Sequence, residues 1–78
     1  MALGDNKAAT ADLDEAVQVD ATNVQAWTSR GLAYERLGQK DKAAGSYAKA
    51  LNINDKYEQA KAGFARVGGE IGRTYQTF

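Results

Sequence analysis

The sequence predicts an all-α protein built from antiparallel helix hairpins, with about four helices. Three observations lead to this prediction. The chain echoes itself at an interval of 34 residues, because Leu37-Gly38 repeats Leu3-Gly4 and small or apolar residues recur in phase behind each pair. Apolar residues within each copy follow helical spacing, and the segments between helices are short and rich in turn formers. A fixed period of this length indicates one supersecondary unit that is copied and stacked.

Composition narrows the classes of function. The 78 residues leave room for one domain, and ten basic residues balance ten acidic ones. There is no Cys and no His, which excludes disulfides, thiolate metal sites and the commonest general base. No apolar run could span a membrane, and the first residues lack the basic and apolar regions of a signal peptide. We expect a soluble protein, cytoplasmic or exported with its parent, with any export signal outside this sequence.

The first predicted helix covers about residues 5–21. Asp5 or Asn6 can cap its start, and Asn23 marks the turn that follows it. Side chains spaced i, i+4, i+7 and i+8 form one apolar face, made of Ala9, Leu13, Ala16 and Val17. We expect a helix of the same kind 34 residues later, where the corresponding residues are Ala43, Tyr47, Ala50 and Leu51.

The second predicted helix covers about residues 24–37 and ends before Gly38, because glycine commonly stands just past a helix end. Its i, i+4 and i+7 positions are Trp27, Gly31 and Tyr34. Asp41 can cap or start the third predicted helix. Gly31 and Ala43 lack bulk, so the facing helices can approach closely there, and larger side chains fill the wider spaces between them.

The fourth predicted helix runs from about Lys56 to Arg66. Residues 52–55 are rich in turn formers, and Asp55 can cap this helix. The glycine pair at 68–69 weakens any helix, so we expect the fourth helix to stop there. Because the links between helices are short, neighbouring helices should run antiparallel.

The tail at 68–78 allows three interpretations. Its apolar residues Ile71, Tyr75 and Phe78 have helical spacing. The segment could fold back over the last helix, enter a groove of a neighbouring molecule, or be disordered.

These features together resemble a tetratricopeptide repeat protein. In that family each 34-residue repeat carries Trp, Leu, Gly and Tyr on its first helix, and Ala, an aromatic residue, Ala and Pro along its second. The residues here that match this pattern, and that would pack the repeat, are Trp27, Gly31, Tyr34, Ala43, Tyr47 and Ala50. Arg30 stands where an aliphatic residue is usual. The resemblance implies a helical domain over 1–67, with the second helix of one repeat at 5–21, a full repeat at 24–57 and the first helix of the next at 58–67.

Asp55 stands where the family usually has its closing proline. Proline would end the third helix firmly, and without it the turn is less strictly specified. A normal turn, a longer continuous helix and an exchange of helices between two chains therefore remain open at this position.

The resemblance also implies a non-enzymatic scaffold that forms part of a superhelix and binds a peptide or partner protein in its concave groove. By the family's pattern, the partner-binding side chains would be Gln25, Thr28, Ser29, Leu32, Glu35, Arg36, Gln59 and Arg66. Ala62 and Gly63 would face the same way. Some family members clamp a peptide's terminal carboxylate, but Thr28, Ser29 and Leu32 replace the residues of that clamp here. The alternative interpretation of this face is a solvated surface without a partner.

Three other functions have weaker support in the sequence. Self-association is possible because the first and last helices each leave an apolar stripe without a neighbour, and because residues 1–22 are acidic and residues 23–78 basic.

Nucleic-acid binding would use the basic residues Arg30, Arg36, Lys40, Lys42 and Lys49, but zero net charge and the lack of a dense basic run argue against it. For an enzyme, the sequence offers no nucleophile–base pair, phosphate-binding loop or metal cluster, and no cofactor is expected. Neighbouring helical residues point apart, so the acidic group is interpreted as solvated charges: Asp12, Asp14 and Glu15.

Overall fold

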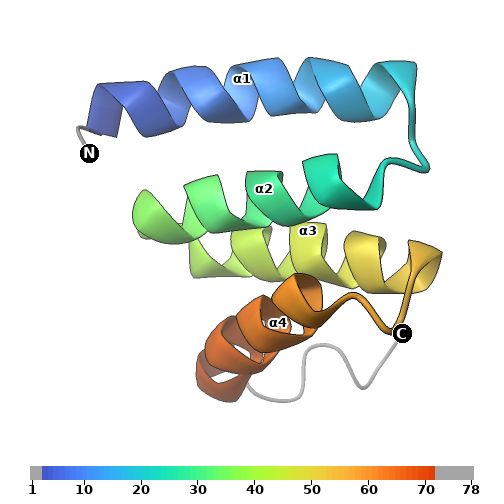
Figure 1. The fold of residues 1–78 in the computed structure, drawn as a ribbon. Helices are drawn as coiled ribbons and strands as arrows, with labels where there is room; N and C mark the ends of the chain where they lie inside the picture. Colours follow the sequence, from blue (N-terminus) through green and yellow to red (C-terminus); the bar gives the residue numbers. More distant parts are fainter. Residues whose placement is uncertain (1–2, 72–78) are drawn as a thin grey trace.

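The computed structural model describes residues 3–71, and these residues form four helices with no strand among them (Figure 1). The helices are α1 (Leu3–Val19), α2 (Val24–Arg36), α3 (Lys40–Ile53) and α4 (Glu58–Ile71). Short links join them, and α1, α2 and α3 run antiparallel in sequence order. The predicted all-α fold of helix hairpins is thereby confirmed.

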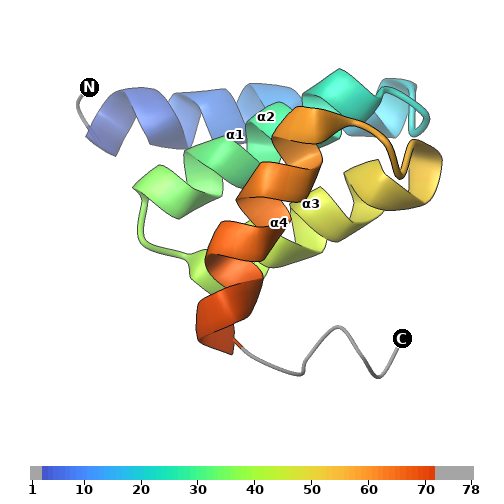
Figure 2. The same cartoon turned by 60° about the horizontal axis from the view of Figure 1, so that its bottom comes forward.

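Helix α2 is the central element of the fold. It contacts α1 on one side and α3 on another, and it also meets α4. Figure 2 shows α4 lying across the hairpin that α2 and α3 form, rather than continuing the row. Helices α2 and α4 therefore come together on one face of the molecule.

Polar side chains fix the turn between α1 and α2. The carboxylate of Asp20 accepts hydrogen bonds from the backbone N–H of Thr22 at 3.1 Å and from its hydroxyl at 2.7 Å. The side chain of Asn23 then accepts a bond from the N–H of Ala26 at 3.0 Å, and so caps α2. Helix α1 ends at Val19, before the predicted end at residue 21, because Asp20 and Thr22 form this turn instead.

The link between α2 and α3 depends on one glycine. Gly38 has a φ of 82°, a conformation that glycine adopts without strain. Its N–H bonds the carbonyl of Glu35 at 3.0 Å, and the N–H of Gln39 bonds the carbonyl of Tyr34 at 2.9 Å. This pair of bonds is a Schellman motif, and it ends α2 just before Gly38, as the sequence predicted. Helix α3 starts at Lys40, so Asp41 lies in its first turn and is not its cap.

The turn before α4 forms normally without proline. The side-chain oxygen of Asn54 accepts a hydrogen bond from the backbone N–H of Lys56 at 3.0 Å. The backbone carbonyl of Asn54 accepts another from the N–H of Tyr57 at 3.2 Å. These bonds keep Lys56 and Tyr57 in the turn, so α4 begins at Glu58 and not at Lys56 as predicted. Asp55 lies inside the turn and does not cap α4.

Both outer helices extend beyond their predicted bounds. Helix α1 already includes Leu3, so Asp5 and Asn6 lie within it and cannot cap its start. Helix α4 continues through the glycine pair at 68–69. A glycine costs a helix only about 1 kcal/mol relative to alanine. Val67, just before the pair, is 1% exposed, and its burial helps to hold the last turns.

The predicted tail lies mostly outside the described residues. Residues 68–71 complete α4, whereas Tyr75 and Phe78 belong to the part of the chain that is not described. The three interpretations of the tail therefore stay predictions, as does the division of the chain into a domain at 1–67 and a tail.

The hydrophobic core lies between α2, α3 and α4. Its buried members are Tyr34, Ala43, Ala44, Tyr47, Ala50, Ala60 and Val67. Trp27 packs against this cluster and donates its indole N–H to the carbonyl of Ala21 at 2.9 Å. Most of the core positions on α3 are alanines, so the backbones can lie close together and the few large rings occupy the remaining space.

Tyr47 fills the space where α2, α3 and α4 meet, and two glycines make room for it. Its side chain is 1% exposed. A Cβ on Gly31 would lie 2.8 Å from two atoms of the Tyr47 ring, and one on Gly63 would lie 2.3 Å from its Cζ atom. Neither position accepts a side chain without movement of the ring or the helices. Gly63 was expected to face the groove, but the structure buries it against Tyr47 instead.

Arg30 joins three helices. Its guanidinium binds the carboxylate of Asp14 on α1 and donates to the hydroxyl of Ser46 on α3 at 2.8 Å. The guanidinium carbon also lies 4.9 Å from the ring centroid of Tyr34 and 5.5 Å from that of Trp27. The interpretation of Asp14 as a solvated charge was therefore wrong. Arg30 acts here as an internal cross-link, in a position where the family usually has an aliphatic side chain.

Candidate functional site

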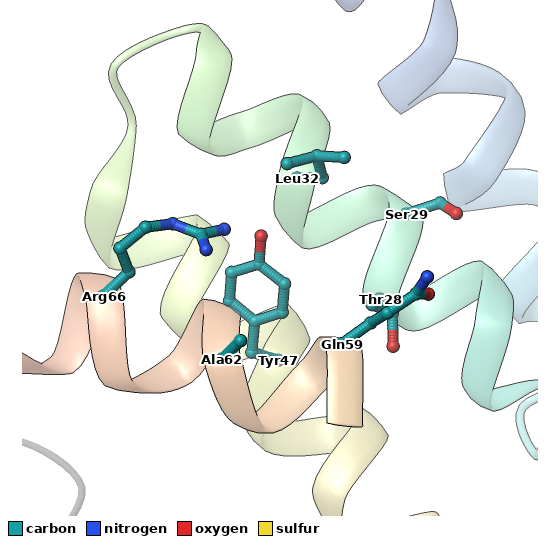
Figure 3. Close-up of a pocket in the computed structure, with 7 residues that line it drawn as sticks. All are labelled: Thr28, Ser29, Leu32, Tyr47, Gln59, Ala62 and Arg66. Carbon is teal, nitrogen blue, oxygen red and sulfur yellow. The ribbon is translucent and has the colours of Figure 1, made fainter. Parts of the chain in front are cut away.

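A hollow of about 240 Å³ opens between α2 and α4, with Tyr47 of α3 at its base (Figure 3). We call it the α2–α4 hollow, and its lining residues are Thr28, Ser29, Leu32, Tyr47, Gln59, Ala62 and Arg66. Leu32 is 37% exposed, a high value for a large apolar side chain. Polar groups stand at both ends of this apolar patch, with Gln59 at one end of the view and Arg66 at the other.

The Arg66 end of the hollow is held by a bidentate ion pair. Arg66 donates from Nε to Oε2 of Glu35 at 2.7 Å and from Nη2 to Oε1 at 2.9 Å. The hydroxyl of Tyr47 donates to the same Oε1 at 2.9 Å. One carboxylate therefore connects α2, α3 and α4, and it fixes the direction of the Arg66 side chain at the mouth of the hollow.

The charges and burial of this cluster shift two pKa values. The hydrogen bonds from Arg66 hold the pKa of Glu35 below its ordinary value, although partial burial acts in the opposite direction. Burial raises the pKa of Tyr47 to about 12, and its hydrogen bond to Glu35 adds to the effect. At neutral pH the cluster therefore contains a carboxylate, a guanidinium and a neutral phenol.

The opposite end of the α2–α4 hollow carries uncharged polar groups. The hydroxyl of Thr28, a residue 7% exposed, donates to the carbonyl of Val24 at 2.8 Å. The Oε1 atom of Gln59 accepts a hydrogen bond from the hydroxyl of Tyr57 at 3.3 Å. Ser29 is exposed on the same wall of α2. This end offers hydrogen bonds to a ligand without offering a net charge.

A second hollow, of about 280 Å³, adjoins the first along α2. We call it the α1–α2 hollow, and it is lined by Leu13, Ala16, Asn23, Gln25, Ala26 and Ser29. Ser29 lines both hollows, so they meet on α2, and we call the two hollows together the strip.

The structure brings most of the predicted partner-binding residues together. Five of the eight line the α2–α4 hollow: Thr28, Ser29, Leu32, Gln59 and Arg66. Gln25 lines the α1–α2 hollow, and Glu35 is the carboxylate that holds Arg66. Arg36 is exposed at the end of α2 and lines neither hollow. Their role in binding stays a prediction, because position alone does not show a ligand.

Sequence reasoning assigned Tyr47 to packing and missed its place at the base of the hollow. The ring is buried, but it borders the hollow because its neighbours on α2 and α4 are Gly31 and Gly63, which place no side chain between the ring and the hollow. Two glycines on the helices that flank an aromatic residue were the signal for this close approach.

The chemistry of the strip is that of recognition through hydrogen bonds and apolar contact. Among the described residues, no group of three acidic side chains comes close enough together to hold a metal ion. No described helix combines the length and apolar character needed to cross a lipid bilayer. The strip presents hydroxyls, amides, one neutralised ion pair and apolar side chains, the largest aliphatic ones being Leu32 and Leu13.

Two protein-family models match the chain. A model described as "TPR repeat" matches residues 1–38, and one described as "tetratricopeptide repeat" matches residues 24–57. The chain matches no curated protein and no solved structure significantly. The second match covers α2, α3 and the turn after them, which is the hairpin that contains Gly31 and Tyr47. Repeats of this kind generally mediate protein–protein interaction, typically as non-enzymatic scaffolds. With 34-residue helix hairpins in both its sequence and its fold, the chain belongs to the tetratricopeptide repeat family.

Proposed function

We propose that this chain is a protein-interaction module that holds an extended segment of a partner protein along the α2–α4 and α1–α2 hollows. The observation that carries the proposal is the α2–α4 hollow itself, which gathers five predicted partner-binding residues from α2 and α4. It is concave, partly apolar and edged by a few polar groups, as ligand sites in proteins commonly are.

The hollow has the parts that a short anchored contact needs. Leu32 and Ala62 offer an apolar surface over the Tyr47 ring, where an aliphatic side chain of the partner would lose contact with water. The ion pair of Arg66 with Glu35 leaves little net charge to desolvate, so an apolar anchor next to it meets a small electrostatic penalty. The Arg66 guanidinium is half-exposed and keeps N–H groups directed away from Glu35.

The proposal is tested by selecting binders from a library of random linear peptides and measuring their affinity for two matched variants. Leu32→Asp places a charge in the α2–α4 hollow and should reduce affinity by at least about tenfold. Ile53→Asp is the control, because Ile53 is 38% exposed, almost the same as Leu32, but lies at the end of α3 outside both hollows. Equal loss of affinity in both variants, or in neither, contradicts the proposal.

A charge reversal at Arg66 gives a second readout. Arg66→Glu removes the bidentate partner of Glu35 and puts two carboxylates together at the mouth of the hollow. We expect the selected peptides to bind this variant poorly, whereas Arg36→Glu, outside both hollows, should keep their affinity. Far-UV circular dichroism of each variant separates lost binding from lost folding.

Self-association is a second candidate function, favoured by the open α1–α2 hollow and by the uneven charge of the chain. Leu13 is only half-buried in that hollow, and residues 1–22 hold one lysine against five acidic residues, whereas residues 23–78 hold nine basic against five acidic. Sedimentation at several protein and salt concentrations tests it. A strict monomer at high protein concentration and low salt rules self-association out.

A further inference from the structure

We infer that Thr28 and Gln59 together form a subsite for one amide group of the bound segment, and this inference rests on the proposed function. The two residues come from opposite walls of the α2–α4 hollow, Thr28 from α2 and Gln59 from α4. In Figure 3 both residues lie at the end of the hollow away from Arg66. What each residue can offer a ligand is set by the hydrogen bonds it already makes.

The hydroxyl of Thr28 can only accept a hydrogen bond from a ligand. Its hydroxyl proton is used in the bond to the carbonyl of Val24, at 2.8 Å, one helical turn earlier. A hydroxyl has one proton and two lone pairs, so Oγ1 retains acceptor capacity but no donor. Thr28 is 7% exposed and lines the hollow, and a partly desolvated acceptor of this kind gains most from a ligand that brings an N–H.

The side-chain amide of Gln59 chiefly offers a ligand hydrogen-bond donors. Its Oε1 atom accepts the hydroxyl of Tyr57 at 3.3 Å, and this contact orients the amide so that the NH₂ group is the part left for a ligand. The side chain is exposed, and it sits on the second residue of α4, at the rim of the hollow. A ligand carbonyl oxygen is the natural partner for this NH₂ group.

An acceptor on one wall and a donor on the other match the two ends of an amide. The N–H of the amide would point to Oγ1 of Thr28, and its C=O would point to Nε2 of Gln59. Two ligand groups have this chemistry, namely a main-chain peptide unit and the side-chain amide of Asn or Gln. A carboxylate, which has no N–H, satisfies only one wall, so the subsite favours amides over acids.

The spacing along α4 fits a short extended segment. Gln59 and Arg66 are seven residues apart on one helix, which corresponds to about 10 Å along its axis. An extended chain rises about 3.3 Å per residue, so about three residues bridge the amide subsite and Arg66. The side chain between them lies over Leu32 and Ala62, which is the apolar part of the hollow.

The test is an NMR titration of the ¹⁵N-labelled chain with blocked peptides that carry no charge. The first probe is acetyl-Ala-Leu-Ala-Ala-methylamide, whose only amides are in the main chain, and its derivatives are N-methylated at one amide at a time. The second probe replaces one Ala of that peptide with Gln. We expect binding to shift the side-chain NH₂ signals of Gln59 together with the backbone signals of Leu32 and Arg66. Loss of binding on one N-methylation assigns a main-chain amide, whereas tight binding of the Gln peptide regardless of N-methylation assigns a side-chain amide.

Three variants complete the test. Gln59→Glu keeps the shape and the acceptor for Tyr57 but removes both N–H donors, and Thr28→Val removes only the oxygen, so each should weaken binding by about tenfold. Gln18→Glu is the matched control, because Gln18 lies on α1, is exposed, and lines neither hollow. It should bind the probes as the wild type does.

The outcomes separate this inference from the proposed function. If Gln59→Glu and Thr28→Val bind the probes as tightly as the wild type while the Leu32 and Arg66 signals still shift, the hollow binds peptides and the amide subsite is wrong. If no amide probe moves any signal of the hollow although library-selected peptides do, the subsite is again overturned. Failure of both probes and selected peptides contradicts the proposed function itself.

Discussion

Gly63 of α4 lies so close to Tyr47 of α3 that an added Cβ would be 2.3 Å from Cζ of the ring. No real side chain tolerates that distance, so either the ring or the helix must move. We expect Gly63→Ala to lower the free energy of unfolding by about 3 kcal/mol, and Gly31→Ala, whose Cβ would have more room, by about 2 kcal/mol.

Gly45 supplies the control for these two substitutions. It lies in α3 and is exposed, and a Cβ added to it would meet no atom within 4 Å. Gly45→Ala should therefore raise the free energy of unfolding by about 1 kcal/mol through helix propensity alone. Urea denaturation followed by circular dichroism measures all three. A stabilising effect of Gly63→Ala would show that α4 does not press on Tyr47.

The hydroxyl of Tyr47 should contribute separately from its ring. Tyr47→Phe keeps the packing but removes the hydrogen bond to the Glu35 carboxylate, so we expect a loss of about 1.5 kcal/mol in the free energy of unfolding. Tyr57→Phe removes an exposed hydroxyl bonded at 3.3 Å and should change stability by less than about 0.5 kcal/mol. Thermal melts of the two variants compare them directly, and equal melting temperatures would contradict the buried hydrogen bond.

Alkaline pH should destabilise the fold through the same residue. Folding raises the pKa of Tyr47 from 10.0 to about 12, so between these values the folded state keeps a proton that the unfolded chain releases. Stability is then fully present below pH 10 and falls as pH rises toward 12. Urea denaturation across this range should show the decline in the wild type and a weaker one in Tyr47→Phe. Identical profiles would mean that Tyr47 titrates alike in both states.

Acid should act on the cluster through Glu35. Its pKa lies below the ordinary 4.5 in the folded state, so the unfolded chain binds the proton first. The stabilisation is present above 4.5 and is lost as pH falls through the lower, folded value. We expect the acid limb of the stability curve to be shallower in Glu35→Gln than in the wild type. Glu58→Gln is the control, because Glu58 is exposed and its ion pair with Lys61, at 3.5 Å, lies on the surface, so the limb should stay nearly unchanged.

The ion pair between Asp14 and Arg30 should couple α1 to the rest of the fold. A double-mutant cycle with Asp14→Asn and Arg30→Met measures this coupling, for which we expect about 1 kcal/mol, since both side chains are partly exposed. The coupling should shrink at high salt. Additive effects of the two substitutions would indicate that α1 is held by apolar contacts alone.

The sequence was sufficient for the helices because their signals are local. The 34-residue echo, the side-chain spacing, the Asn23 cap and Gly38 each act within a few residues, and the structure has α2 where they placed it. The other helix ends were less predictable. They depend on Asx turns at Asp20 and Asn54 and on burial of Val67, which decide between two locally acceptable conformations.

For the candidate site, the family pattern predicted which residues share a face, but it did not predict their contacts. That pattern brought Thr28, Leu32 and Gln59 to one face, but it gave no hydrogen-bond partners. The pairing of Arg66 with Glu35 spans 31 residues, and such contacts follow from how α4 crosses α2 rather than from either residue. For the same reason a solvated Asp14 was a sound expectation for a helix surface and was wrong for this one.

Chemical-shift mapping with a library-selected peptide decides whether partners bind in the α2–α4 hollow. We expect the largest backbone shifts on Thr28, Leu32, Ala62 and Arg66, and we expect Leu32→Asp to abolish them while Ile53→Asp does not. Shifts concentrated on the exposed residues of α1 or α3, with those of the hollow unmoved, would contradict it.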